Sequence, residues 1–418
     1  MLKAYKYRLL PNEQQRTYTN RCIGCARFVY NNLLSDYKSQ LDERSNKPKI
    51  KEVTFLKHTY PFLNEVDSLA LANAKIHLST ALKNFFESRN KKRKGKKMGF
   101  PKKHKKSKCR LSYTTNNQGG NIRIEDGKIK LPKIGYVQMV YHREIEGEIR
   151  SVTVSQERDG TYYVSILTDH DNKAQSRKDI DLKKLKVIGI DMSYKDFAVD
   201  SDTVLDETKP KFDRQYRKAE KKRSRLNRQL SRKVIGSSSR DKARKCLARL
   251  DRKIANRRND FCHKMSKYYA TRYDVIVLED ISMQDMQKRG LRGHGKSVSD
   301  LCFGKFKNYL SYKCEIYDSC LMYVDKWFAS SKTCNHCGER NELLRLSDRE
   351  WVCPSCGCVI DRDFNAACNL KDYFFRVIDI DTAGTAGINA VGEHTNTLRE
   401  TLMQACSLKT EAPNFRWG

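Results

Sequence analysis

The chain has 418 residues and carries 83 lysines and arginines against 50 aspartates and glutamates, a formal net charge of +33. This length exceeds a single hydrophobic core, so we expect at least two domains. Such a basic surface favours polyanionic partners, nucleic acid above all. No apolar run reaches the roughly 20 residues of a membrane span, and the N-terminus lacks a signal peptide's apolar core. The 15 cysteines are an odd number and mostly scattered, which fits a reducing cytosol better than a disulfide framework.

A strand and two helices are predicted at the start of the chain. Residues 3–10 alternate tyrosine and leucine with lysine and arginine, a period of two that indicates a strand. Apolar residues then recur at helical spacing from 12 to 43 and again from Ser68 onward. Cys22-x-x-Cys25 has no second pair nearby, so we interpret it as two buried core thiols. The lysine-rich run after the second helix is open to two interpretations, phosphate contact or a solvated loop.

Between residues 109 and 170, short strands replace the helices. Asp126-Gly127 stands at a predicted hairpin turn, and Gly160 closes a second hairpin. We expect these strands to form a small β-barrel that the N-terminal strand completes, with the helical region inserted between them.

The next segment contains apolar strands that end in acids. A strand is predicted from Lys186 to Asp191, and a short strand antiparallel to it over 197–200. A continuous apolar run further along ends at Glu279-Asp280, and such a run is typical of a strand covered on both faces.

A long basic helical pair is predicted between those strands, from 213 to 269, with a break at 236–239. Its second helix has one apolar stripe, interpreted as core, and basic residues on its other faces, which are candidates for nucleic-acid contact. The stripe consists of Leu247, Leu250, Ile254, Phe261 and Met265. A helix around Phe306 and a strand over 321–324 follow.

Four cysteines form the strongest local pattern. Cys334-x-x-Cys337 and Cys353-x-x-Cys356 are two knuckles separated by 15 residues. Four thiolates at this spacing can close a tetrahedron round Zn²⁺. The alternative is four unlinked buried cysteines. We treat the neighbouring Cys358 as a bystander.

Acids and a last helix follow the cysteines. Asp361-Arg-Asp363 comes first, and residues 365–375 have the apolar pattern of a helix. From residue 382 onward polar residues, glycine and threonine dominate without periodicity, so we interpret this tail as disordered.

Asp191, Glu279 and Asp363 lie far apart in sequence, but two of them end apolar strands and the third opens a helix. Neighbouring strand ends converge in an α/β sheet, so these carboxylates can share one pocket. Crowded carboxylates need cations, and Mg²⁺ prefers carboxylate oxygens. Two such ions about 4 Å apart support in-line displacement at a phosphodiester, so we predict a nuclease. Each acid alone is also open to a plainer interpretation, as a strand-end or helix-cap residue.

The motifs GID, VLED, WFASSKTCNHCG, CPSCG and DRDFNAACNL occur in this order around a long basic helical insert. They strongly resemble those of the TnpB family, transposon-encoded RNA-guided nucleases that are related to type V CRISPR effectors and were formerly called OrfB transposases. The resemblance extends to YKYRLLPNEQQ near the start, HREIEGEIRSV in the strand-rich region and EAPNF close to the C-terminus, so it covers nearly the whole chain.

The resemblance implies a multidomain α/β fold plus a β-barrel. A RuvC-like, RNase H-type nuclease domain with a zinc-ribbon insertion follows an oligonucleotide-binding-like wedge β-barrel that holds an inserted helical recognition domain. The implied division is the first barrel strand (1–10), the helical recognition domain (11–108), the wedge barrel (109–180), the nuclease domain (181–326) with its basic insert (213–270), the zinc ribbon (327–360), the last nuclease motif and helix (361–380) and a disordered tail (381–418).

The resemblance also implies site residues and cofactors. Asp191 in GID and Glu279 rather than Asp280 in VLED are expected to be catalytic and to bind magnesium, together with one aspartate of DRDFNAA. For the last we choose Asp363, because related type V effectors keep the acid two before the asparagine; Asp361 is then a loop or cap residue. The implied cofactors are two Mg²⁺ ions that Mn²⁺ can replace, a structural Zn²⁺ on the four cysteines, and a guide RNA.

The implied activity is guide-directed cleavage of double-stranded DNA beside a short flanking motif. A guide RNA from the end of the same mobile element is expected along the basic barrel and helical faces, and its pairing reads the target. Residues 113–117 and the helix from Ser68 are candidate contacts to the flanking DNA. A separate transposase of the same element is a further expected partner. The expected location is the prokaryotic cytoplasm, in association with the nucleoid and without a membrane partner.

Two alternatives remain open. The first is a transposase-type strand-transfer enzyme that joins transposon ends. The second is a non-catalytic RNA-guided DNA-binding protein with structural carboxylates, and the intact set of three acids argues against it.

Overall fold

The computed structural model describes residues 2–43, 48–90, 97–170, 185–193, 197–202, 206–211, 216–280, 302–324, 328–345 and 348–384. Its contacts divide the chain into two units, which are described separately. The first unit is Met1–Asn172 with Arg232–Ala248, and the second is Lys173–Ser231 with Arg249–Gly418. The predicted disordered tail lies outside the described residues from 385 onward, as does part of the lysine-rich run, 91–96.

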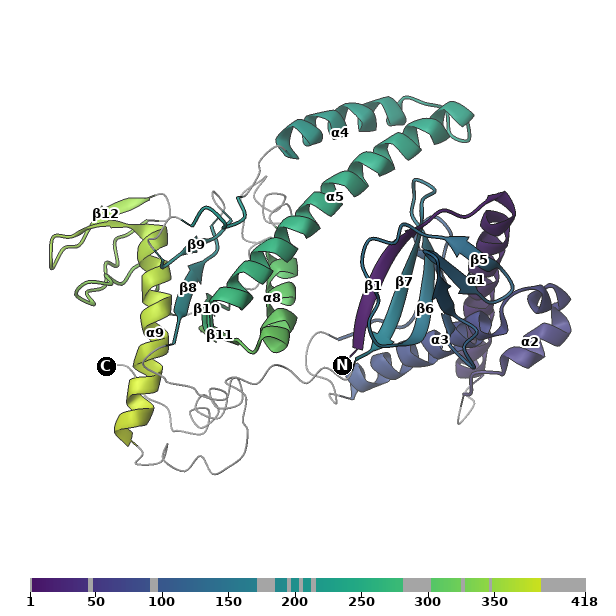
Figure 1. Ribbon diagram of the computed structural model, residues 1–418, viewed down its shortest axis with the longest axis horizontal. Coiled ribbons are helices and arrows are strands. Elements are labelled where there is room, and N and C mark those ends of the chain that lie inside the picture. The colour runs from purple at the N-terminus through teal and green to yellow at the C-terminus, as the bar shows by residue number, and fades with distance from the viewer. Residues whose placement is uncertain are drawn as a thin grey trace. The chain divides into compact units, whose positions relative to one another are not determined.

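The strands of the first unit form two antiparallel sheets (Figure 1). One has the order β1-β7-β6-β2 and the other β3-β4-β5. Their bounds are Leu2–Leu9 for β1, Leu111–Asn116 for β2, Arg123–Glu125 for β3, Lys128–Leu131 for β4, Gly135–Gln138 for β5, Glu148–Gln156 for β6 and Tyr162–Asp169 for β7. A single bridge, Leu9 to Met139, joins the end of β1 to the residue after β5.

The two predicted hairpins are confirmed as β3–β4 and β6–β7. In the first, Asp126 and Gly127 have φ of 47° and 70°. Left-handed backbone at both central residues belongs to a type I′ turn, which explains the Asp-Gly pair. Strands β2 and β5 were not predicted, and the closed barrel stays a prediction.

The helices of the first unit pack on this sheet core. They are α1 (Glu13–Asp42), α2 (Val53–Thr59), the short 3₁₀ helix η1 (Pro61–Glu65) and α3 (Ser68–Arg89). A capping box between Asn12 and Gln15 begins α1. Cys22 and Cys25 are 0% and 5% exposed, which confirms them as core thiols. Helix α2 and η1 were missed because each is too short to show periodicity.

The second unit is built on a sheet of order β11-β10-β8-β9, in which β8, β10 and β11 are parallel and β9 is antiparallel to β8. Helices α5 and α8 lie on one side of this sheet and α9 on the other (Figure 1). The bounds are Val187–Asp191 for β8, Val199–Asp200 for β9, Tyr216–Ser231 for α4, Ser238–Arg272 for α5, Val275–Glu279 for β10, Phe303–Tyr317 for α8, Cys320–Val324 for β11, Glu350–Val352 for β12, Val359–Asp361 for β13 and Arg362–Gly384 for α9. The predicted strands and helices of this region are therefore confirmed.

The two faces of the sheet explain why β8 and β10 are apolar throughout. Ile188 and Ile190 face the core of α5 and α8, whereas Val187 faces the core of α9. Side chains alternate along a strand, so Gly189 and Asp191 point to the α9 face as well. A strand covered on both faces needs apolar residues at every position.

Gly189 allows α9 to lie directly on β8. A Cβ atom at this position would lie 2.0 Å from the carbonyl oxygen of Ala367 and 2.6 Å from the backbone nitrogen of Lys371. Any side chain here pushes the helix away from the sheet. The glycine of the GID motif is therefore a packing requirement.

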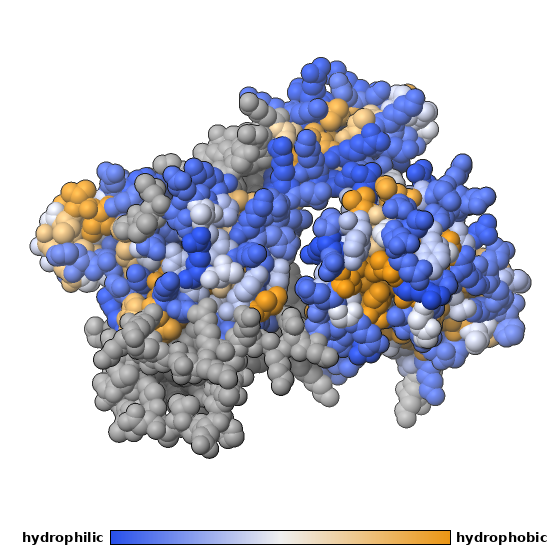
Figure 2. Space-filling view, viewed as in Figure 1, coloured by the Kyte–Doolittle hydropathy of each residue, from blue (hydrophilic) through white to orange (hydrophobic). Residues whose placement is uncertain are grey.

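The helices α4 and α5 form a basic hairpin (Figure 1), and much of its visible surface is hydrophilic (Figure 2). Arg223 of α4 and Asp251 of α5 pair at 2.6 Å. The prediction that the whole apolar stripe of α5 is core was wrong. Ile254 and Met265 are buried and Phe261 is partly buried against the core, whereas Leu247 and Leu250 stay partly exposed, because only the C-terminal part of α5 packs against the sheet. Within the described residues, no helix is both long and apolar enough to cross a membrane.

Candidate active site and metal centre

Asp191 and Glu279 are neighbours at the carboxyl edge of the parallel sheet. Asp191 is the last residue of β8 and Glu279 the last of β10, and the preceding residues Ile190 and Leu278 are paired in the register. Residues opposite each other on parallel strands point to the same face, with strands about 4.8 Å apart. Both carboxylates therefore point to the face that α9 covers.

Helix α9 adds the third acid. Asp363 lies in its first turn, four residues before Ala367, whose carbonyl oxygen lies against Gly189. Residues four apart share one face of a helix, about 6 Å apart along its axis. Asp363 therefore lies about one helical turn beyond the contact with Gly189, on the side of Asp191. The charges of Asp363 and Glu279 both raise the pKa of Asp191, so the three acids form one electrostatic cluster.

Burial is the main cause of the perturbed acidity. The pKa of Asp191 is raised from 3.8 to about 7, first by burial and then by the charges of Asp363 and Glu279, while Arg362 opposes the shift. Burial also raises the pKa of Glu279, and the ammonium group of Lys307 opposes that shift. Perturbation by burial together with specific charges is typical of functional sites.

The donor set fits Mg²⁺, because all three groups are carboxylates and hard cations prefer oxygen ligands. Within the described residues, only cysteine-containing groups bring three ligand atoms within 4.8 Å of one another. The oxygen atoms of the three carboxylates are therefore farther apart than the ligands of one ion would be. Two ions about 4 Å apart need such a wider span.

Asp363 has cationic partners that the sequence did not predict. Its carboxylate accepts hydrogen bonds from Arg349 at 2.8 Å, from Arg362 at 3.2 Å and from the hydroxyl of Ser193 at 3.4 Å. Arg362 stands inside the DRDFN motif and could have been found there. Arg349 precedes β12, and no sequence pattern links it to the acid.

The other two candidate acids occupy different positions. Asp361 is the last residue before α9, and its carboxylate accepts the backbone N–H of Phe364 at 2.8 Å, the geometry of an N-cap. This agrees with its interpretation as a cap. Asp280 is exposed, one residue beyond the end of β10.

The four predicted zinc ligands come together in the ribbon, where all four sulfur atoms lie within 4.8 Å of one another. Cys334 and Cys356 are 3.7 Å apart, and Cys337 and Cys353 are 3.5 Å apart. A tetrahedron with Zn–S bonds of about 2.3 Å has edges of about 3.8 Å, so this set fits zinc. Backbone N–H groups of the second knuckle lower the pKa of Cys353 to about 7 and favour its thiolate.

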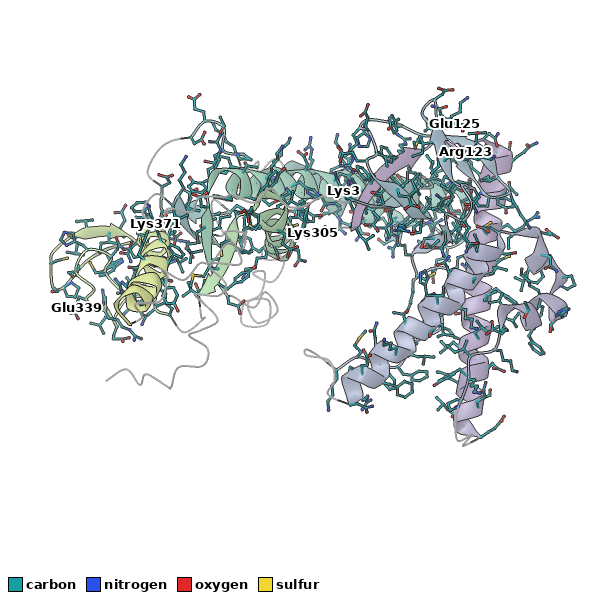
Figure 3. The ribbon with its side chains drawn as sticks, turned by 60° about the horizontal axis from the view of Figure 1, so that its bottom comes forward. Lys3, Arg123, Glu125, Lys305, Glu339 and Lys371 are labelled. Atoms are coloured by element: carbon teal, nitrogen blue, oxygen red, sulfur yellow. The ribbon has the colours of Figure 1, made fainter. Side chains whose placement is uncertain are left out.

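The ribbon is hydrogen-bonded to α9. The Asn335 backbone N–H donates to the side-chain oxygen of Asn365 at 2.9 Å, and the Asn335 side chain donates to Asn369 at 3.2 Å and to Asp372 at 2.6 Å. In return, Asn365 and Asn369 donate to the carbonyl oxygen of Thr333. Figure 3 shows the two parts side by side, with Glu339 in the ribbon and Lys371 on α9. The ribbon that carries the four cysteines therefore helps to hold the helix that carries Asp363.

The candidate DNA contacts in the first unit need a correction. The structure brings β2 and α3 together, and Asn73 donates to Asn116 at 3.4 Å. Within residues 113–117, however, Tyr113 and Thr115 are buried, because alternate residues of β2 face the core. These two side chains cannot contact DNA directly.

These features define a class, the multidomain α/β proteins in which a parallel sheet with acids at its carboxyl edge is followed by a zinc-ribbon-like cysteine cluster. A solved Cas12f1–sgRNA–target DNA complex has a similar fold, with a TM-score of 0.52 and 14% identity over 86% of this chain and 83% of that chain. Family models match residues 165–290 (OrfB of IS605, "probable transposase"), 303–370 (Cas12f1-like TNB domain) and 1–46 (helix-turn-helix domain). In the last segment the described residues form β1 and the single helix α1.

The chain belongs to the TnpB-like OrfB family. A protein of Streptomyces pristinaespiralis, whose name proposes an RNA-guided DNA endonuclease, is 33% identical over 379 residues, 88% of each chain. InsQ of Escherichia coli K12, with the same proposed activity, is 29% identical over 389 residues, 88% of this chain and 91% of InsQ. The family resemblance predicted from the sequence is thereby confirmed.

Proposed function

We propose that this protein is an RNA-guided DNA endonuclease in which Asp191, Glu279 and Asp363 are the catalytic, Mg²⁺-binding residues. The observation that carries the proposal is the meeting of three acids from β8, β10 and α9 at one sheet edge, with the pKa of Asp191 raised to about 7. The names of full-length relatives support the same activity.

The chain's own groups perform distinct tasks in this proposal. Asp191 and Glu279 present oxygens from a rigid parallel sheet, and Asp363 presents its carboxylate from α9. Bound Mg²⁺ supplies positive charge that neutralises the acids and stabilises charge on the phosphodiester. Arg349 and Arg362 hold the Asp363 carboxylate in a fixed orientation. Burial of Asp191 keeps bulk water from screening these charges.

We propose the domain architecture of the family as well. The second unit's sheet corresponds to a RuvC-like, RNase H-type core. The two sheets of the first unit correspond to a wedge β-barrel, and α1 to α3 are the inserted recognition domain. The chain is proposed to be divided as in the family, from the first barrel strand to the zinc ribbon and the last helix. The zinc held by the four cysteines is structural and contributes to target binding.

The proposed partners are polyanions, in keeping with the charge of +33. A guide RNA from the end of the protein's own mobile element binds basic faces, including the α4–α5 hairpin, through shape and backbone contacts. RNA pairing selects the double-stranded DNA target beside a short flanking motif. Transposon-end joining is left to a separate transposase of the element. The proposed location is the prokaryotic cytoplasm, at the nucleoid.

The test begins with the RNA. The protein is expressed together with its flanking genomic DNA and purified, and the RNA that co-purifies is sequenced. One discrete species ending at the element's border is expected. The purified complex should then cut a plasmid with a matching target in the presence of Mg²⁺ or Mn²⁺ and not with a chelator.

Matched variants separate the roles of neighbouring acids. Glu279→Gln should abolish cutting and leave RNA retention unchanged, whereas Asp280→Asn, an exposed neighbour, should cut like the wild type. Heterogeneous RNA bound in a salt-sensitive way, without cutting, would point to a plain nucleic-acid-binding protein. Joining of transposon ends by the purified protein would point to a strand-transfer enzyme. Either result rejects the proposal.

A further inference from the structure

A second group of metal-ligating side chains lies beside the four zinc cysteines. The ligand atoms of His336, Cys356 and Cys358 all lie within 4.8 Å of one another. Cys356 belongs to both groups, and the other two residues belong only to the second. The sequence pattern gave Cys358 no role, because only the two Cys-x-x-Cys pairs have zinc-knuckle spacing.

The fold of the two knuckles explains this arrangement. His336 lies within the first knuckle, between Cys334 and Cys337. In the second knuckle, Gly357 has a φ of +72° and the N–H of Cys353 donates to the carbonyl oxygen of Cys358 at 2.9 Å. This tight turn brings Cys358 back beside Cys356. Ordinary knuckle geometry thus gathers three potential ligands on the outside of the first site.

We infer that the ribbon has a second metal site, for a borderline or soft divalent ion of the Zn²⁺ class. His336 and Cys358 are its own ligands, and the Cys356 thiolate bridges the two ions. One imidazole and two thiolates form a donor set that suits Zn²⁺ and excludes Mg²⁺ or Ca²⁺, which take oxygen ligands.

Charge and exposure distinguish the second site from the four-cysteine site. Four thiolates round one Zn²⁺ leave excess negative charge, which a second cation shared through Cys356 reduces. His336 is exposed, and Cys356 and Cys358 are partly exposed, so the site opens to solvent. Three protein ligands leave a fourth position open, unlike the closed four-cysteine site. The second ion is therefore the more readily exchanged of the two.

The inference rests on the four-cysteine site but not on nuclease activity, so its test uses metal binding alone. The full-length protein is stripped of metal under reducing conditions and titrated with Co²⁺, whose charge-transfer absorption reports each thiolate bond. Zn²⁺ bound after gel filtration is then measured by elemental analysis. Wild type should retain two ions. Cys358→Ser and His336→Gln should each retain one, with the absorption of the four-cysteine site intact.

Cys246→Ser is the matched control, since Cys246 is an exposed cysteine on α5 that belongs to neither group of ligands, and it should leave two ions bound. A persisting Co²⁺ spectrum of the first site shows that a variant's ribbon is folded. Binding of a single ion by wild type overturns the inference. Retention of two ions by Cys358→Ser also overturns it, because the second ion would then lie elsewhere.

Discussion

Replacing Asp191 by asparagine should stabilise the metal-free protein while abolishing DNA cleavage. The pKa of Asp191 rises from 3.8 to about 7 on folding, so the folded state binds the extra proton. Stability from this group is present below pH 4 and is lost as pH rises through 7. The shift corresponds to at most about 4 kcal/mol above pH 7. Asparagine carries no charge and avoids that loss.

The assay must follow the sheet itself, because the chain has two units and need not unfold in one step. Hydrogen exchange of the β8 and β10 amides, read by mass spectrometry in a chelator, gives the local free energy of opening. Wild type and Asp191→Asn are compared at pH 5 and pH 8. Groups that titrate equally in both proteins cancel in this comparison. The variant's advantage should grow with pH, toward about 4 kcal/mol as the ceiling.

Mg²⁺ provides the internal control. An ion that binds only the folded state stabilises it in proportion to its affinity, so Mg²⁺ should protect β8 in wild type and much less in the variant. Equal protection of both proteins at pH 8 without metal would refute the reasoning. It would mean that burial and the two neighbouring carboxylates do not raise the pKa of Asp191.

Three further results are expected. Gly189→Ala should destabilise the second unit by about 3 kcal/mol or more in denaturation and abolish cutting, because its Cβ would lie 2.0 Å from the Ala367 oxygen. The control is Gly304→Ala, where a Cβ meets open space, and it should change stability by less than about 1 kcal/mol. Asp363→Asn should abolish cutting, while Asp361→Asn should leave both cutting and the melting temperature unchanged, since asparagine caps helices as well as aspartate does. Loss of cutting in Asp361→Asn but not in Asp363→Asn would make Asp361 the catalytic residue. Removing the ribbon's zinc with a chelator and then restoring Mg²⁺ should lower the cleavage rate roughly a hundredfold, which is the cost of a displacement of about 1 Å at a catalytic group. An unchanged rate would show that the ribbon does not help to position Asp363.

The sequence predicted those parts of the structure in which local pattern and tertiary environment agree. The apolar runs of β8 and β10 indicated strands, the second of them covered on both faces, and their last residues indicated where the acids lie. The turn at Asp126-Gly127 could also be predicted, because its conformation depends on these two residues. Tyr113 was misread because polar neighbours hid the alternation of β2, in which every second residue faces the core. The contact of Arg349 with Asp363 depends on how the ribbon folds back on α9, and no spacing in the sequence encodes it.

The order of restraints along α9 explains why a structural metal should influence catalysis. Ribbon contacts hold the helix at Asn365 and Asn369, and the sheet holds it at Ala367, against Gly189. Asp363 precedes all three, in the first turn, where backbone N–H groups have no partner within the helix. Loss of the ribbon removes the contact at Asn365 and the Arg349 hydrogen bond to Asp363, and it leaves the sheet contact in place. The first turn should therefore fray while the rest of α9 stays packed, and the third acid moves without unfolding of the core.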